Sequence, residues 1–150
     1  MANAKIGSYS SYNYTFIESI DTTGKQLTPG DSGKVFMCDQ NSSADVDINL
    51  PQLSTSIAGW HAKFVMRTSS SNAFNIIAYG SAVGGATTGD SDKIVFLEQA
   101  AGASIAGAAD VVLFNASNAE AGCYISIFTD GSKWYAHGRG ADDNDLATVG

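Results

Sequence analysis

Apolar and polar residues alternate over short stretches of this chain, and each stretch ends at Gly, Asp, Asn, Ser or Pro. The clearest case is residues 45–51, DVDINLP, where Val46, Ile48 and Leu50 share one face and polar residues the other. A period of two is typical of a strand with one buried face. Pro51 ends this strand because it has no N–H for the ladder.

The same pattern predicts nine strands and one helical turn. We expect strands at residues 13–20, 34–39, 45–51, 60–67, 73–80, 92–97, 111–117, 123–129 and 133–138, and the helical turn within 52–59. Short strands with turns every 8–12 residues favour an all-β fold, an antiparallel β-sandwich that is jelly-roll-like and has 8–9 short strands. Neither long helices nor a repeat of 20–50 residues is visible, which disfavours doubly wound, propeller and solenoid folds.

The strongest local signal is residues 123–138, CYISIFTDGSKWYAHG, a hairpin around Asp130-Gly131-Ser132. Cys123, Ile125 and Ile127 should face the core, and Trp134 should pack in the sandwich. By contrast, residues 98–110 are almost all small and are interrupted by glycines. We expect a close-packed loop or a short distorted segment there.

A length of 150 residues fits one domain. The strands predict a β-sandwich over residues 15–138, preceded by an N-terminal arm, 1–14. Residues 139–150 are polar and acidic, and we expect a loose C-terminal tail or an arm that orders on a partner.

The chain carries 15 Asp and Glu against 8 Lys and Arg, a formal net charge of −7, which disfavours nucleic acid as a direct partner. No run of 18 apolar residues and no apolar leader segment is present, so we expect neither a membrane span nor a Sec signal. Cys38 and Cys123 are expected as buried, reduced thiols in a cytosolic product. A disulfide between them stays open, because sequence does not place two cysteines in contact.

Candidate catalytic chemistry is sparse. His61 and His137 are the two histidines, and each falls within a predicted strand without a nearby nucleophile motif. The carboxylates Asp45 and Asp47 fall on an exposed strand face instead of across a cleft. No phosphate-binding glycine motif is present. We therefore expect no enzyme and no cofactor.

Two segments leave a binding role open. Asp90 and Asp92 lie in a glycine-rich turn that offers oxygen ligands for a weak Ca²⁺ site, but without the spacing of a known calcium loop. Tyr9, Tyr12 and Tyr14 lie close together near the N-terminus. They suit contacts with a neighbouring subunit, or a stacking platform for bases or sugars.

Several motifs occur in a recognisable order: LTPGDSGKVFMCD (27–39), INLP (48–51), Gly59 followed by KFVM (63–66), and FTDGSKWYAHG (128–138). Together they resemble small jelly-roll or β-sandwich virion proteins of tailed bacteriophages, which include capsid decoration (cement) proteins and domains of head or tail fibres.

This resemblance implies a homotrimer on the capsid surface of a virion, where it would bind the major capsid protein and stabilise the head after assembly in the host cytoplasm. It implies no catalytic residue. The residues that it marks as structural are Gly33, Leu50, Pro51, Gly59, Asp130, Gly131, Trp134 and Gly138.

One alternative is a receptor- or glycan-binding knob of a head or tail fibre, in which Trp60, Trp134 or the N-terminal tyrosines contact host sugars. The chain begins with Met and contains no heptads or collagen-like repeat, and a fibre tip usually follows such a stalk. This favours decoration. A polysaccharide depolymerase is disfavoured because no carboxylate pair spans a cleft.

Overall fold

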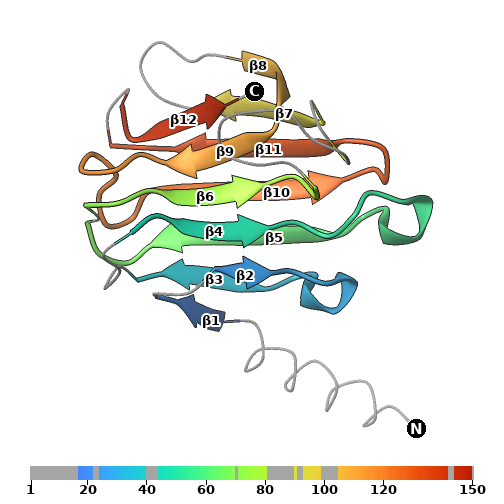
Figure 1. The fold of residues 1–150 in the computed structure, drawn as a ribbon, viewed down its shortest axis with the longest axis horizontal. Coiled ribbons are helices and arrows are strands. Elements are labelled where there is room, and N and C mark those ends of the chain that lie inside the picture. Colours follow the sequence, from blue (N-terminus) through green and yellow to red (C-terminus); the bar gives the residue numbers. More distant parts are fainter. Residues whose placement is uncertain are drawn as a thin grey trace, which may run out of the picture.

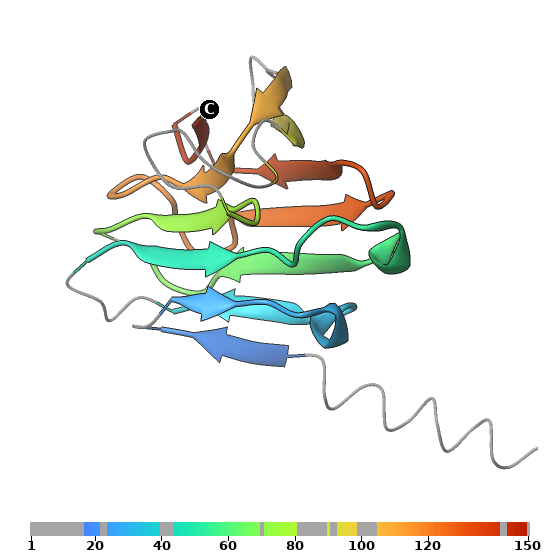
Figure 2. The ribbon, with the colours of Figure 1, turned by 45° about the vertical axis from the view of Figure 1, so that its right-hand side comes forward.

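The computed structural model describes residues 17–21, 24–39, 44–69, 71–80, 90, 93–98, 105–141 and 144–149. Within these residues the chain forms two β-sheets that pack face to face around a common core (Figure 1). The all-β sandwich predicted from the alternating pattern is confirmed. Figure 2 shows the two layers from a second angle, with β1 at one end of the stack and the C-terminus at the other.

The first sheet has seven strands, in the order β1 (Ile17–Ile20), β3 (Val35–Cys38), β5 (His61–Met66), β10 (Tyr124–Thr129), β11 (Trp134–Arg139), β7 (Ile94–Glu98) and β8 (Ile105–Ala109). The second has five, in the order β12 (Leu146–Val149), β9 (Val111–Phe114), β6 (Phe74–Ile77), β4 (Val46–Asn49) and β2 (Lys25–Gln26). Two single 3₁₀ turns complete the described structure: η1 (Pro29–Asp31) and η2 (Thr55–Ile57). The helical turn predicted within 52–59 is therefore confirmed.

The first six strands alternate between the two sheets. β1, β3 and β5 stack in parallel in one sheet, while β2, β4 and β6 stack in parallel in the other. Parallel neighbours need a crossover connection, and here a strand of the opposite sheet supplies it. Strands β1 to β6 thus wind as a flattened coil, which we call the winding half.

The parallel stacks make the sandwich mixed, whereas we expected antiparallel pairing throughout. Turn geometry also repeats along the coil: η1 leads into Gly33 with φ 84°, and η2 leads into Gly59 with φ 87°. Ser32 and Ala58, which precede these glycines, have nearly the same φ and ψ. The sequence analysis missed this repeat because the two turns share only a glycine, the residue that adopts positive φ without strain.

Strands β9 to β12, which we call the closing half, pair with one another and with the winding half in antiparallel fashion, while β11 pairs in parallel with β7 on its other side. β10 and β11 form the predicted hairpin, with Thr129 opposite Trp134, and β10 also pairs with β5. β12 and β6 flank β9. The closing half therefore joins the winding half in both sheets.

Three strands lie outside the nine predicted ones: β2, β8 and β12. The expectation of a loose tail is wrong for residues 146–149, because β12 pairs with β9 and Leu146 is buried. A Cβ on Gly138 would lie 2.6 Å from Leu146 Cδ1, so β11 and β12 pack closely. The expected loop over 98–110 contains β8, which pairs with β7. β8 is rich in small residues, and β2 and β12 are short and pair with strands that are distant in sequence.

Large apolar side chains fill the space between the sheets. The largest fully buried ones include Trp134, Phe36, Phe64, Phe74, Phe114, Leu27, Ile48, Leu50, Met66, Ile76, Ile94 and Ile125. Cys38 and Cys123 are buried and unpaired, as expected. Burial raises the pKa of the Cys38 thiol to about 12. Neither thiol is therefore suited to nucleophilic chemistry.

Charged residues close the core at the β1/β2 end. Glu18 occupies the register position that Phe36 and Phe64 fill with buried rings in the next two strands. Lys25 lies in β2, at the edge of the second sheet beside Ile48, and forms an ion pair with Glu18. Its Nζ lies 5.5 Å from the centre of the Phe36 ring. Lys34 Nζ adds a contact of 3.0 Å to Glu18. We call this group the ionic cap.

Candidate functional site

The outward side chains of β1, β3, β5, β10, β11 and β7 lie on one face of the seven-stranded sheet. The strand register aligns them in three rows: His61, Phe128, Tyr135 and Val95; Ile17, Val35, Lys63, Ser126, His137 and Leu97; and Ser19, Met37, Val65, Tyr124 and Arg139. We call these residues the aromatic face. The alternate residues of the same strands point into the core and are largely buried, so the position of each outward side chain follows from the period of two.

The aromatic face exposes much of the apolar surface of the described residues. Among the described residues four large hydrophobic side chains are exposed, and three of them belong to this face: Ile17 is 68% exposed, Phe128 49% and Leu97 37%. The fourth, Tyr79, is 39% exposed and follows β6 in the other sheet. Ile17 lies on β1, Phe128 on β10 and Leu97 on β7, so the exposed apolar side chains are spread across this face with polar residues between them. Apolar surface concentrated on one face of a protein is typical of interaction sites.

The rings of the aromatic face support one another. Phe128 and Tyr135 stack with centroids 5.3 Å apart and planes inclined by 21°. Tyr124 meets His137 edge to face at 6.4 Å, and Lys63 Nζ lies 4.3 Å from the Tyr124 ring centre. A partner would therefore meet side chains whose orientations are already restricted.

None of the residues in the three rows is an aspartate or glutamate, although the chain carries 15 of them. Two carboxylates lie at the margin of the face: Asp39 follows β3, and Asp130 accepts the Tyr135 hydroxyl. Lys63 and Arg139 contribute positive charge. Arg67, just beyond β5, is paired with Asp39 at 2.8 Å and donates to Ser19 Oγ at 2.7 Å. The face is thus apolar and mildly basic on a protein whose net charge is negative.

The outer face of the five-stranded sheet differs. Ala73, Ile77, Val111 and Leu113 form a small buried cluster there. The exposed residues Asp45 and Asp47 are used structurally: Asp45 accepts the Ala73 N–H at 2.9 Å, and Asp47 accepts Asn75 Nδ2 at 2.8 Å. These hydrogen bonds fix neighbouring strands and leave no paired carboxylates across a cleft.

Four residues marked by the resemblance lie in turns near the starts of β3, β5 and β11. Gly33 N donates to His61 O at 2.7 Å, and Gly59 N donates to Thr129 O at 2.8 Å. Gly131 has φ 93°, and a Cβ there would lie 2.8 Å from Ser54 O. Asp130 begins the same hairpin turn.

The Asp130 carboxylate organises that turn. Its Oδ1 accepts the N–H groups of Ser132 and Lys133 at 2.8 and 2.9 Å and the Ser132 hydroxyl, while Tyr135 Oη donates to Oδ2 at 3.1 Å. The two backbone hydrogen bonds, followed by the Ser132 hydroxyl, hold the pKa of Asp130 well below its usual range. The turn is therefore linked to the Tyr135 ring of the aromatic face.

The other four marked residues are buried. Leu50 N donates to Ile77 O at 2.8 Å, and Pro51 follows it out of β4. Gly138 lies beneath Leu146. Trp134 is fully buried, as predicted, and meets Trp60 edge to face at 5.3 Å. Trp60 is also buried. The glycan-binding alternative expected one of these rings to contact a sugar, but neither is exposed.

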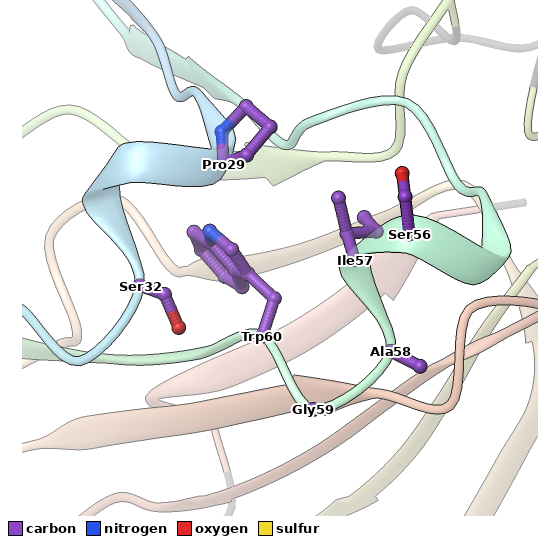
Figure 3. Close-up of a pocket in the computed structure, with 7 residues that line it drawn as sticks. All are labelled: Pro29, Ser32, Ser56, Ile57, Ala58, Gly59 and Trp60. Atoms are coloured by element: carbon purple, nitrogen blue, oxygen red, sulfur yellow. The ribbon is translucent and has the colours of Figure 1, made fainter.

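A hollow of about 230 Å³ lies between the two 3₁₀ turns (Figure 3). It is lined by Pro29, Ser32, Ser56, Ile57, Ala58, Gly59 and Trp60. The Trp60 indole N–H donates to Thr28 O at 3.1 Å, which fixes the ring as a wall of the hollow. The lining offers hydroxyl groups but no carboxylate, imidazole or thiol, and thus no side chain suited to acid–base catalysis.

A second hollow, of about 460 Å³, shares Pro29, Ser56 and Ile57 with the first. Its wall also includes the exposed Tyr79 and the polar Gln52. An exposed aromatic ring therefore stands beside this hollow.

Several expected site residues fall outside the described residues, namely Tyr9, Tyr12, Tyr14 and Asp92. Asp90 is described, and its Oδ2 accepts the Leu53 N–H at 2.7 Å. Within the described ranges, no three His, Cys, Asp or Glu side chains gather as metal ligands. The part of the chain that the structure describes also contains no helix long and apolar enough to cross a membrane.

The sequence analysis identified the strands of the aromatic face but not the face itself. The available signal was the aromatic residues at outward positions of predicted strands, Tyr124, Phe128 and Tyr135. The analysis treated the alternation only as evidence for a core. Which strands become neighbours is decided by tertiary pairing, and only then do these rings form one surface.

The chain matches no protein-family model, and searches of curated proteins and of solved structures likewise found no match.

Proposed function

We propose that this chain is a virion structural protein that docks onto another protein through the aromatic face. The observation that carries this proposal is that Ile17, Phe128 and Leu97 are all exposed on one sheet face, which also carries the mutually supported rings of Tyr124 and Tyr135. Covering such a surface removes apolar area from water, which is the main favourable term in protein association.

The chemistry of the face suits a protein partner. Aromatic residues and arginine are enriched at protein interfaces, and acidic residues are depleted from their cores. Phe128 and Tyr135 already stack on each other, so docking would cost little side-chain entropy. The hollow beside Trp60, by comparison, has no group for acid–base chemistry.

The sequence resemblance supplies the setting. We infer a capsid decoration protein, trimeric on the head of a tailed bacteriophage, where it contacts the major capsid protein and stabilises the shell. Residues marked by the resemblance, such as Gly131 and Trp134, lie in turns and core positions that build the sandwich. They support the fold on which the aromatic face is displayed.

The direct test is the number of copies on purified particles of a phage that encodes the chain. Quantitative mass spectrometry and cryo-electron microscopy should find hundreds of copies on the head. A handful of copies at the tail would contradict decoration. Phe128→Ser should abolish attachment to heads that lack the protein, whereas the matched exposed aromatic variant Tyr79→Ser should attach normally.

A second candidate function, a glycan-binding knob of a fibre, is favoured by Tyr79 alone. Its exposed ring stands beside the hollow of about 460 Å³ that Gln52 also lines, and sugars commonly stack on such rings. Here Tyr79→Ser should abolish binding to host cells and Phe128→Ser should not. The same two variants thus separate the two functions.

A further inference from the structure

We propose that the partner covering the aromatic face is an acidic protein surface. The inference rests on the proposed docking function and adds the chemistry of the partner. It comes from the distribution of charge over the two faces of the sandwich.

The cations of the aromatic face are placed to meet carboxylates. Lys63 and Arg139 point outward from β5 and β11, and no outward residue of the face is an Asp or Glu. Arg67 is different, because Asp39 already pairs with it. Lys63 Nζ lies over the Tyr124 ring at 4.3 Å, a contact that leaves its charge in place. A docked surface would therefore have to supply carboxylates for Lys63 and Arg139, since desolvated charges are costly unless they are paired.

A second copy bound face to face fits poorly. In a symmetric contact the same patch faces itself, so Lys63 and Arg139 of one copy would approach the same cations of the other. Like charges juxtaposed across an interface are unfavourable. The charge pattern therefore selects against self-stacking through this face and in favour of a different, acidic surface.

Single-stranded nucleic acid fits less well than an acidic protein. Phe128 and Tyr135 stack on each other, so each ring has one face already covered, whereas base-binding platforms present open ring faces. Lys63 and Arg139 are few for a backbone contact, and the net charge of −7 repels phosphate at longer range. An apolar protein surface with carboxylates matches both parts of the face.

The test uses the full chain and a poly-L-glutamate peptide of about 20 residues as the probe, with amide chemical shifts recorded at low salt. Perturbations should be confined to β5, β10 and β11. Lys63→Gln/Arg139→Gln should weaken binding about tenfold, as expected for two exposed ion pairs. The control Gln52→Glu/Ala116→Glu reaches the same net charge, −7 − 2 = −9, at exposed positions off the face, and should bind like the wild type.

Three results would overturn the inference. The first is an equal loss of affinity for polyglutamate in both double variants, because net charge alone would then explain binding. The second is tighter binding of a thymidine 20-mer than of polyglutamate through Lys63 and Arg139. The third is a concentration-dependent shift of β5 and β10 signals without probe, which would indicate self-association through the face.

Attachment to phage heads is measured separately, so the two proposals fail independently. If Lys63→Gln/Arg139→Gln attaches to heads as well as the wild type does, the proposal of an acidic partner is overturned and the docking proposal stands. Polyglutamate binding as expected, with no copies on the particles, would support the acidic preference and overturn decoration.

Discussion

The winding half and the closing half bury similar side chains but pair their strands in different ways. In the winding half each strand pairs in parallel with a strand two positions away along the chain, as Val35 of β3 pairs with Lys63 of β5. In the closing half, β10 and β11 are adjacent in sequence and meet through one turn. A local turn specifies a hairpin, whereas a parallel coil needs contacts between distant residues before any pair forms. The comparison explains why the pairing of the hairpin was visible in the sequence and the parallel pairing of the coil was not.

The two halves meet at a pair of tryptophans. Trp60 directly precedes β5 of the winding half, and Trp134 is the first residue of β11. Their rings contact edge to face. The hairpin turn also lies against η2, where Gly131 approaches Ser54. The closing half therefore completes the core that the winding half leaves open, and this junction should be the most sensitive place in the molecule.

The largest effect should come from removing the tryptophan at this junction. Trp134→Ala should lower the free energy of unfolding by about 3–5 kcal/mol, because a large fully buried ring is lost and a cavity remains. Chemical denaturation monitored by circular dichroism measures it. Phe128→Ala, on the exposed face, should cost less than about 1 kcal/mol. Unchanged stability of Trp134→Ala with loss of partner binding would contradict the structural role.

Two glycines with similar φ test whether the contact between the halves matters beyond backbone strain. Gly59 and Gly131 have φ of 87° and 93°, but a Cβ at Gly59 meets nothing within 4 Å while one at Gly131 meets Ser54 O. Gly59→Ala should cost about 1–2 kcal/mol from strain alone. Gly131→Ala should cost about 2–4 kcal/mol, because η2 must move as well. Equal costs in thermal unfolding would show that the contact is unimportant.

The ionic cap tests how the winding half ends. Glu18→Leu should cost about 1 kcal/mol, because Lys25 and Lys34 lose their shared partner at the edge of the core. Glu18→Leu/Lys25→Leu should recover most of that stability but associate at high concentration, since inward charges protect strand edges from pairing with other chains. Sedimentation analysis measures the association. A double variant that behaves like the wild type at all concentrations would remove the protective role.

The smallest effect should be the pH dependence of stability that two carboxylates cause, Asp31 in the winding half and Asp130 in the closing half. The folded-state pKa of Asp130 is lowered by hydrogen bonds in its turn. Burial acts to raise the pKa of Asp31, but hydrogen bonds from Lys34 and Thr28 outweigh it and leave the pKa lowered. Each carboxylate should stabilise the fold above its unfolded pKa of about 3.9 and lose that contribution as pH falls through the folded value.

Asp130→Asn should therefore be less stable than the wild type at pH 6, and the gap should narrow below about pH 4. Urea denaturation at several pH values measures this gap. Asp31→Asn should show the same trend, with an added loss from the Lys34 contact of 2.7 Å. A gap for Asp130→Asn that stays constant down to pH 2 would contradict the hydrogen-bonded carboxylate.

Sequence reasoning succeeded where the determining contacts are local. The alternation of Val46, Ile48 and Leu50 with polar residues predicts a strand with one buried face, and Asp130-Gly131 predicts the hairpin. It failed for β2, β8 and β12, which are short or rich in small residues and are held by partners elsewhere in the chain. Of the candidate site, it identified the strands but not the surface they build together.

The sequence by itself determined the all-β class, the buried and exposed sides of most strands, and the turn residues, because each depends on neighbours within a few positions. Only the tertiary structure decided the parallel winding, the placement of Glu18 and Lys25 as a cap, and the meeting of Phe128 with Tyr135 on one face. Those arrangements depend on which strands lie side by side, and each parallel pair of the winding half joins residues separated by a strand of the opposite sheet.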